Sequence, residues 1–300
     1  MTPDSSHERL ERALASLRGL AVGDALGSQF FVPANYPLLQ RRELPPGSWQ
    51  WTDDTEMACS VVAVLAAHGR IHQDALALSF AEHHDFDRGY GPAVNRLLRL
   101  VREGGDWREL AAELFNGQGS WGNGAAMRIA PLGAWYADDP EQATHQAEIS
   151  AYPTHQHREA VVGAMAVAAA AALAASPGGP PSPEILLDRV IELVPKSAVG
   201  AGLRRARDML DYDDPGTVAA VLGCGRRTSA HDTVPFAVWS AARALGDFER
   251  AFWATAQVGG DVDTTCAIVG GVIAAGKAGV PPAAWADRTE ALPDWVPHVT

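Results

Sequence analysis

The chain has 300 residues, of which 47% are hydrophobic and 20% are charged, and its formal net charge is −12. This composition supports a large folded core and excludes wholesale disorder. An acidic surface repels phosphate backbones, so a general nucleic-acid-binding surface is not expected. The three scattered cysteines, Cys59, Cys224 and Cys266, are too few for a disulfide framework and indicate a reducing, cytoplasmic environment.

Neither a signal peptide nor a membrane span is expected. Residues 1–12 are polar and mixed in charge, which is not the pattern of a secretory signal. The longest apolar run, Ala160 to Ala175, is shorter than the ~20 residues that a membrane span needs, and it is mostly alanine. A tightly packed buried helix explains this run better. We therefore expect no membrane contact. Oligomeric state stays open, and a monomer is the default for a soluble chain of this size.

Apolar side chains recur at helical spacing along most of the chain. The predicted helices, in chain order, lie at residues 10–21, 57–65, 73–83, 94–101, 107–115, 141–150, 156–175, 184–194, 199–210, 235–245, 248–256 and 264–278. Gly-rich breaks are expected at 19–27, 117–124 and 259–263. Alternating Val, Ile and Thr runs are almost absent, so no sheet is expected. The patterns predict an all-α protein whose connecting loops carry the function.

The clearest loop is Ser176 to Pro183, with the sequence SPGGPPSP. Such a stretch is either a linker between two domains or a surface connection within one domain. We favour the second interpretation, which makes residues 1–300 a single domain.

The first informative segment is Trp51 to Glu56, with the sequence WTDDTE, and an apolar helical pattern follows it directly. Thr52 or Asp53 can cap this helix by accepting a backbone N–H hydrogen bond, and acidic residues in the first turn suit the helix dipole. Taken alone, the segment is more typical of an ordinary helix start than of a metal site.

The second segment is Gly259 to Thr265, with the sequence GGDVDTT, and it also precedes a long apolar helix. Its Asp-x-Asp pattern places the carboxylates of Asp261 and Asp263 at the entry to the helix, next to the Thr264 hydroxyl. Capping one helix needs only one or two acceptors. Two such dense clusters therefore favour a role beyond capping.

The two segments together offer donors that are all oxygen atoms, on Thr52, Asp53, Asp54, Asp261, Asp263 and Thr264. Oxygen donors suit hard cations such as Mg²⁺, Ca²⁺ or Mn²⁺ rather than Zn²⁺. Four neighbouring carboxylates repel one another without a cation, and they can hold two divalent ions about 3.5–4 Å apart. This hypothesis requires residues 52–54 to meet residues 261–264 in space.

Six blocks of the chain resemble, in the same order, those of the ADP-ribosylglycohydrolase family, which includes dinitrogenase-reductase-activating glycohydrolases and ADP-ribosyl-acceptor hydrolases. The blocks are GDALG at 23–27, WTDDT at 51–55, DRGYG at 87–91, GSWGNGAAMR at 119–128, THQH at 154–157 and GDVDT at 260–264. Any one block is weak evidence, whereas six in family order are a strong signal. The resemblance covers most of the chain.

The resemblance implies a compact orthogonal helical bundle that hydrolyses the C1″ linkage of ADP-ribose to an acceptor. It implies two Mg²⁺ ions, for which Mn²⁺ could substitute, held by the six Thr and Asp residues named above. It places the catalytic work on Asp53, Asp54 and Asp263. Among acceptors, a protein arginine or serine, O-acetyl-ADP-ribose and a nucleobase all stay open.

The resemblance also indicates the ligand contacts, which are Asp87, Gly119, Ser120, Trp121, Gly122, Asn123, Met127 and His155. Backbone N–H groups in the Gly-rich stretch could cradle a pyrophosphate, although such a loop alone is weak evidence. A lone Trp is more often a packing residue than a ring that stacks on a ligand. Asp24 is expected to support the metal-binding helices as an acceptor, and His157 to cap a helix. Arg128 is expected to pair with a phosphate or in an internal salt bridge.

One position departs from the family pattern. Many relatives carry a Glu four residues after the last glycine of the Gly-Asp block, where this chain has Phe31. In some relatives this Glu works at the metal centre or gates it, and Asp87 or Glu56 are the candidates to replace it here. The alternative function is a catalytically impaired protein that binds ADP-ribose without cleaving it. A third hypothesis, a different helical Mg²⁺ hydrolase, lacks the His-Asp or Glu-rich helix motifs expected of it.

Overall fold

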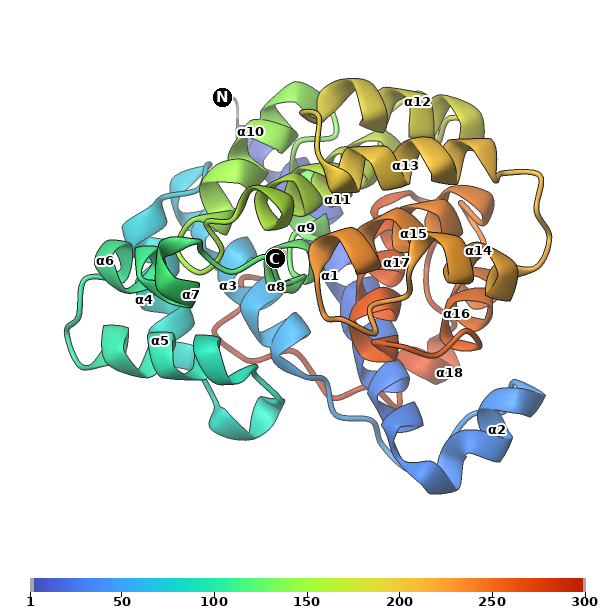
Figure 1. Ribbon diagram of the computed structural model, residues 1–300, viewed down its shortest axis with the longest axis horizontal. Coiled ribbons are helices and arrows are strands. Elements are labelled where there is room, and N and C mark those ends of the chain that lie inside the picture. Colours follow the sequence, from blue (N-terminus) through green and yellow to red (C-terminus); the bar gives the residue numbers. More distant parts are fainter. Residues whose placement is uncertain (1–2, 299–300) are drawn as a thin grey trace.

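The computed structural model describes residues 3–298, which fold into α-helices joined by loops (Figure 1). No β-sheet occurs within these residues, and only two isolated bridges are present, Trp49–Thr289 and Gly122–Ser229. The predicted all-α class is therefore confirmed. The helices are α1 Pro3–Ser28, α2 Tyr36–Arg41, α3 Asp53–His68, α4 Gln73–His83, α5 Pro92–Arg102, α6 Trp107–Ala112, α7 Leu114–Gly117, α8 Gly124–Met127, α9 Ala130–Trp135, α10 Pro140–Ala151, α11 Arg158–Ala174, α12 Pro183–Leu193, α13 Ala198–Asp208, α14 Pro215–Leu222, α15 Ala230–Arg243, α16 Phe248–Ala256, α17 Val262–Ala275 and α18 Ala283–Ala286.

Helices α1 and α17 lie side by side at the centre of the molecule (Figure 1). Their backbones approach closely because glycines line the contact. A Cβ atom at Gly19 would lie 2.2 Å from the Cβ of Ala274, and one at Gly23 would lie 2.1 Å from the carbonyl oxygen of Cys266. The predicted break at residues 19–27 is wrong, since α1 continues through it. The glycines serve close helix packing here.

Several further helices differ from the predicted pattern. Helix α15 begins at Ala230, five residues before the predicted start at 235, and it contains Pro235. The proline removes one backbone donor. Its ring packs against Gly202, where an added Cβ would lie only 2.4 Å from Pro235 Cγ. The short helices α2, α8, α9, α14 and α18 were not predicted, because none has more than 8 residues and so short a segment gives little periodicity.

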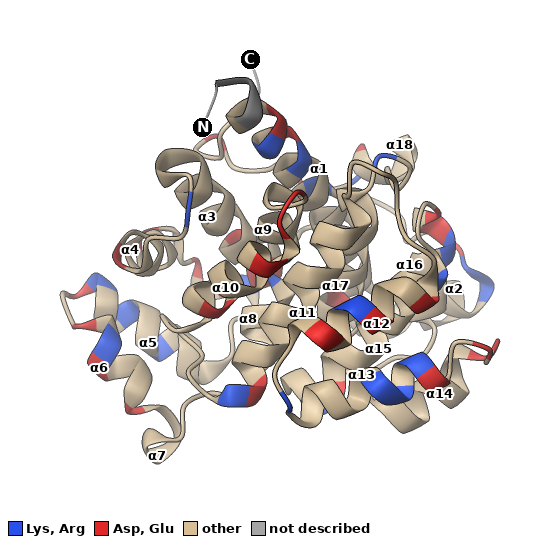
Figure 2. Ribbon diagram, turned by 90° about the horizontal axis from the view of Figure 1, so that it is seen from above, with Lys and Arg blue, Asp and Glu red and all other residues tan. Residues whose placement is uncertain are grey.

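The alanine-rich run forms α11, whose side chains are buried almost throughout. A buried, tightly packed helix is what the sequence predicts there. Among residues 3–298, no helix combines the length and the apolar character needed to cross a bilayer. Figure 2 shows that charged residues gather on outer helices such as α5 and α13, whereas most of α11 is free of them.

The main hydrophobic core draws on side chains from Ala13 to Val296. A small second cluster lies between α4, α5 and α6 and includes Ala77, Leu97 and Trp107. The single domain over 1–300 stays a prediction, and its end residues 1–2 and 299–300 lie outside the described part of the chain.

Candidate active site

The first acidic segment is held in place by α1. Thr52 is the N-cap of α3, and its Oγ1 accepts a hydrogen bond from Asp54 N at 3.4 Å, so the predicted cap is confirmed. The carboxylate of Asp24, in the middle of α1, accepts hydrogen bonds from both the backbone and the hydroxyl groups of Thr52 and Thr55. Asp24 is fully buried. It therefore ties the start of α3 to α1, as expected of an acceptor that supports the site.

The second acidic segment enters α17 through a tight turn. Gly259 and Gly260 both have left-handed backbone angles, with φ of 72° and 85°, which glycine adopts without strain. Asp261 then accepts a hydrogen bond from Asn123 Nδ2 at 2.7 Å. Asp263 Oδ1 accepts one from the backbone N–H of Thr264 at 2.7 Å. The turn and these bonds fix where the two carboxylates lie.

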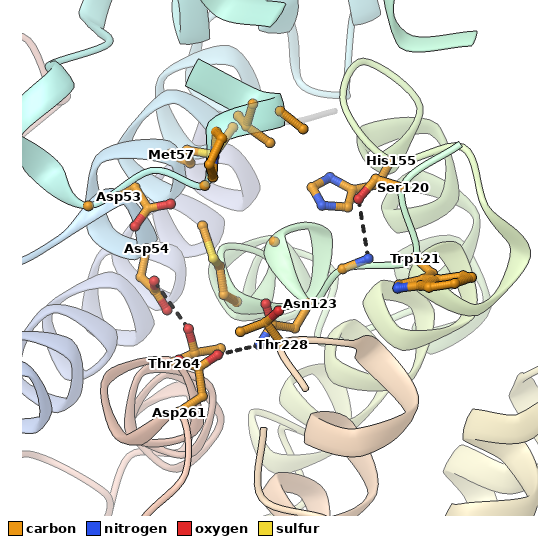
Figure 3. A pocket seen from close by; sticks show the side chains of 18 of the residues that line it. Asp53, Asp54, Met57, Ser120, Trp121, Asn123, His155, Thr228, Asp261 and Thr264 are labelled. Carbon is orange, nitrogen blue, oxygen red and sulfur yellow. Dashed lines mark hydrogen bonds between the residues drawn. The ribbon is translucent and has the colours of Figure 1, made fainter. Parts of the chain in front are cut away.

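The two acidic segments meet in space. The hydroxyl of Thr264 donates to Asp54 Oδ2 at 3.4 Å, across a sequence separation of 210 residues. Figure 3 shows Asp53 and Asp54 on one side of this contact and Asp261 with Thr264 on the other. The metal-site hypothesis requires residues 52–54 to meet residues 261–264 in space, and this contact fulfils that condition.

Burial and mutual repulsion disfavour the charged form of these carboxylates. Burial, followed by the charge of Asp24, raises the pKa of Asp53 to about 8. The pKa of Asp54 is raised well above its ordinary value for the same reasons, with a further contribution from Asp263. Burial also raises the pKa of Asp261 and, with repulsion from Asp261, that of Asp263. A cation placed among them would reverse this shift.

The donor chemistry of the cluster fits a hard divalent cation. All its side-chain donors are oxygen atoms, and the buried Asp54 Oδ1 has no hydrogen-bond partner in the described structure. Within residues 3–298, however, no three His, Cys, Asp or Glu side chains already surround one point as ligands would. Asn123 engages one oxygen of Asp261 and the Thr264 N–H engages one oxygen of Asp263, which leaves the second oxygen of each carboxylate for an ion.

A Gly-rich loop forms the wall opposite the carboxylates (Figure 3). The Ser120 hydroxyl accepts from the backbone N–H of Gly122 at 3.3 Å. Asn123 donates both to Thr233 Oγ1 and to Asp261, so it joins the loop to the second acidic segment. The ring of Trp121 is half exposed and meets the ring of His157 edge-on. His157 itself caps α11, as predicted.

Between the carboxylates and this loop lies a cavity of about 470 Å³, a size typical of small-molecule sites. The predicted site residues that line it are Asp53, Asp54, Ser120, Trp121, Gly122, Asn123, Met127, His155, Asp261, Asp263 and Thr264. The structure thus gathers most of the predicted metal ligands and ligand contacts around one space.

Three predicted site residues do not line this cavity. The Thr52 hydroxyl is bonded to Asp24 and lies on a neighbouring groove of about 550 Å³, which also contains Asp87. Gly119 packs against the backbone of residues 156–157 instead. The proposed roles of Thr52 in metal binding and of Asp87 and Gly119 in ligand binding therefore stay predictions without support from the cavity.

The position that departs from the family pattern lies outside the cavity as well. Phe31 is 51% exposed and follows α1 in a short 3-10 helix. Asp87 and Glu56, the two residues suggested to replace the family Glu, do not line the cavity either. The Glu56 carboxylate accepts hydrogen bonds from Tyr90 Oη and from Asp85 N. Glu56 instead holds the loop of residues 85–91 against α3.

Arg128 fulfils neither of its two predicted roles. Its side chain is fully buried and does not line the cavity. It forms no ion pair within residues 3–298, and its guanidinium donates to Thr154 Oγ1 and to the carbonyl of Ser150. Burial lowers the pKa of Arg128 to about 9.

Several lining residues were missed by sequence reasoning. Phe115 and Thr228 line the cavity in left-handed conformations, with φ of 54° and 51°, which no sequence signal predicts for such residues. Met57 could have been predicted to line the cavity, because it lies one helical turn after Asp53 and so shares its face of the helix. Gly89 and Gly91 belong to the DRGYG block, where only Asp87 was selected.

Comparisons with known proteins agree with this geometry. The family model for ADP-ribosylglycohydrolases matches residues 5–299. ADP-ribosylhydrolase ARH3 of Gallus gallus is 28% identical, covering 92% of this chain and 88% of its own length. An uncharacterized protein of Archaeoglobus fulgidus is 31% identical, covering 85% of this chain and 84% of its own.

A solved structure, described as an ADP-ribosylglycohydrolase-related protein complex, superimposes with a TM-score of 0.61. It is 28% identical and covers 93% of this chain and 92% of its own. The match of sequence and fold thus extends over nearly the whole length of the chain. The chain therefore belongs to the ADP-ribosylglycohydrolase family and is a hydrolase of that family.

Proposed function

We propose that this protein hydrolyses the C1″ linkage between ADP-ribose and an acceptor at a binuclear Mg²⁺ site between the starts of α3 and α17. One observation carries the proposal: two acidic segments 210 residues apart meet at the wall of a cavity large enough for part of a nucleotide. Mn²⁺ is the expected substitute for Mg²⁺, because it accepts the same oxygen donors. The expected monomeric state and cytoplasmic location remain predictions.

The ligands of the ions would come from the carboxylates that line the cavity, Asp53, Asp54, Asp261 and Asp263, together with the hydroxyl of Thr264. When bound, divalent ions offset the repulsion between the carboxylates and supply Lewis-acid activation of water and of ribose hydroxyls. Asn123 would release the Asp261 carboxylate or keep one of its oxygens in place.

The remaining chemistry falls to the protein's own side chains. Cleavage at C1″ passes through an oxocarbenium-like state, which needs a base to take the proton of the attacking water. Asp53 and Asp54 are the carboxylates that line the cavity from α3, and either can accept that proton when ionised. On the opposite wall, the backbone N–H groups of Gly122 and Asn123 already donate within the protein, whereas those of Ser120 and Trp121 have no acceptor among the described residues and can hold the pyrophosphate.

The first experiment compares Asp54→Asn and Asp263→Asn with wild type and with Asp213→Asn, a control whose carboxylate is 95% exposed. Each protein is incubated with ADP-ribosylated arginine, ADP-ribosylated serine, O-acetyl-ADP-ribose and an ADP-ribosylated base, with Mg²⁺ or with EDTA. We expect the two cavity variants to lose at least about 100-fold in rate, since each removes a ligand or the base. The control should match wild type.

Calorimetric titration with ADP-ribose separates the proposal from its alternative. Binding without turnover of any of the four substrates would identify a catalytically impaired ADP-ribose-binding protein. Full activity of Asp263→Asn, or wild-type activity in EDTA, would contradict the proposed metal centre. Comparison of the four hydrolysis rates identifies the preferred acceptor.

A further inference from the structure

Arg128 has contacts that are unusual for a buried cation. It follows Met127, which lines the cavity, and its side chain is fully buried. Its Nη1 donates to Thr154 Oγ1 at 3.0 Å, its Nη2 donates to the Ser150 carbonyl at 3.0 Å, and its guanidinium lies 4.5 Å from the centroid of the Phe80 ring. No carboxylate of residues 3–298 pairs with it. Burying an unpaired charge costs free energy, so we expect Arg128 to have a role that an apolar side chain could not fill.

The contact with Thr154 decides the direction of the next hydrogen bond. A guanidinium only donates, so the Thr154 oxygen must be the acceptor in this pair. The hydroxyl has one hydrogen, and its other partner is Nδ1 of His155, at 2.7 Å. The described residues offer this hydroxyl no other acceptor, so its hydrogen is satisfied when it donates to Nδ1. A neutral imidazole that accepts at Nδ1 carries its proton on Nε2.

His155 lines the ligand cavity (Figure 3), and the Nε2 edge of its ring lies against the loop glycines that line the same cavity. The Gly-rich loop leaves room for this edge, because a Cβ at Gly122 or Gly124 would lie 3.2 Å or 2.9 Å from Nε2. Within the described chain, no residue accepts a hydrogen bond from Nε2. Burial, together with the charge of Arg128, lowers the pKa of His155 to about 3, so the ring is neutral near pH 7.

We infer that Arg128 and Thr154 are positioning residues that hold His155 as the tautomer with its proton on Nε2, so that the ligand contact predicted for His155 is made by a donating N–H. This inference rests on the proposed function, since it takes ADP-ribose as the ligand. The opposite tautomer would direct a lone pair at an oxygen that can only accept, such as a phosphate oxygen, and would weaken binding.

The tautomer can be measured without any ligand. Protein labelled with ¹⁵N-histidine is examined by NMR, and the His155 signals are assigned by their loss in His155→Gln. We expect an unprotonated Nδ1 and a protonated Nε2 in wild type and in Thr154→Ser, which keeps the hydroxyl. Thr154→Val removes only the hydroxyl and should give a mixture of tautomers. Arg128→Met should also give a mixture of tautomers. If Arg128→Met does not fold, the comparison of Thr154→Val with Thr154→Ser tests the inference.

The second readout is the affinity for ADP-ribose, measured by calorimetry. Thr154→Val should bind about 3- to 10-fold more weakly than wild type, because one hydrogen bond to the ligand is lost in part of the molecules. Thr154→Ser should restore binding. The matched control is Thr144→Val, which removes a buried hydroxyl that donates to a helical carbonyl far from the cavity.

Two results would overturn the inference. One is a His155 ring with its proton on Nδ1 in wild type, and the other is unchanged affinity in Thr154→Val. Failure of wild type to bind ADP-ribose would instead overturn the proposed function and the ligand contact with it. In that case the NMR experiment still decides whether Arg128 and Thr154 set the tautomer.

Discussion

At the cavity wall, the space beside Gly124 is filled by the His155 ring. A Cβ at this position would lie 2.7 Å from Cε1 and 2.9 Å from Nε2 of that ring. Gly124→Ala should therefore displace the ring and weaken ADP-ribose binding about tenfold or more, while costing about 1–3 kcal/mol of stability. Calorimetry gives the affinity, and urea unfolding gives the free energy.

The control for this substitution is Gly178→Ala in the loop before α12, where a new Cβ meets no atom within 4 Å. It should leave both quantities unchanged within about 0.5 kcal/mol. Equal affinities of Gly124→Ala and wild type would show that His155 does not need its present position.

Single residues differ in how well the sequence predicts them. Thr52 and the aspartates could be selected because an N-cap and a dense acidic cluster are local patterns. The contact between Thr264 and Asp54 could only be hypothesised, because no local pattern contains a sequence separation of 210 residues. The role of Arg128 was missed, since its meaning depends on which side chains surround it once buried.

At the scale of helices, α1 acts as a support on which α3 begins. Asp24 alone accepts the backbone N–H groups of Thr52 and Thr55 as well as their hydroxyls. Asp24→Ala should lower the free energy of unfolding by about 2–4 kcal/mol, because these buried donors lose their acceptor. It should also weaken Mg²⁺ binding, since the Asp53 and Asp54 carboxylates would shift with the helix start.

Asp214→Ala is the matched control for Asp24→Ala. Asp214 accepts from Gly216 N, Thr217 N and the Thr217 hydroxyl at the start of α14, but this carboxylate is exposed to water. Its removal should cost less stability, because water replaces the lost acceptor. It should not change Mg²⁺ binding. Similar effects of the two substitutions would show that burial at Asp24 does not matter.

Helix prediction succeeded where periodicity was long. Gln73–His83 and Phe248–Ala256 have the predicted bounds, and the longer α11 and α17 differ from prediction by no more than three residues at either end. The error at 19–27 has a different cause. Glycine lowers the stability of an isolated helix, but close packing of a neighbouring helix on the glycines offsets that loss.

For the molecule as a whole, the carboxylate cluster makes stability depend on pH. The pKa of Asp53 is about 8 in the folded chain and about 4 when unfolded, so the folded state binds more protons between these values. Stability should therefore fall as pH rises through this window. In EDTA, the melting temperature should be lower at pH 8 than at pH 6. Mg²⁺ should raise it more at pH 8, because ligands bind when deprotonated.

Asp54→Asn provides the comparison for this pH experiment. It removes one of the coupled carboxylates, so the fall in melting temperature between pH 6 and pH 8 should become smaller in EDTA. A pH dependence identical to that of wild type would mean that other groups cause it.

The pairing of α1 with α17 has a consequence for how the enzyme comes into being. During synthesis on the ribosome, α1 and α3 emerge early, whereas Asp261 and Asp263 follow only after α16 has been made. Until then, the glycines of α1 have no helix to pack against, and the cavity lacks one of its walls. A chain that stops before residue 261 would thus lack Asp261, Asp263 and Thr264, so the proposed activity should appear only after α17 has been made.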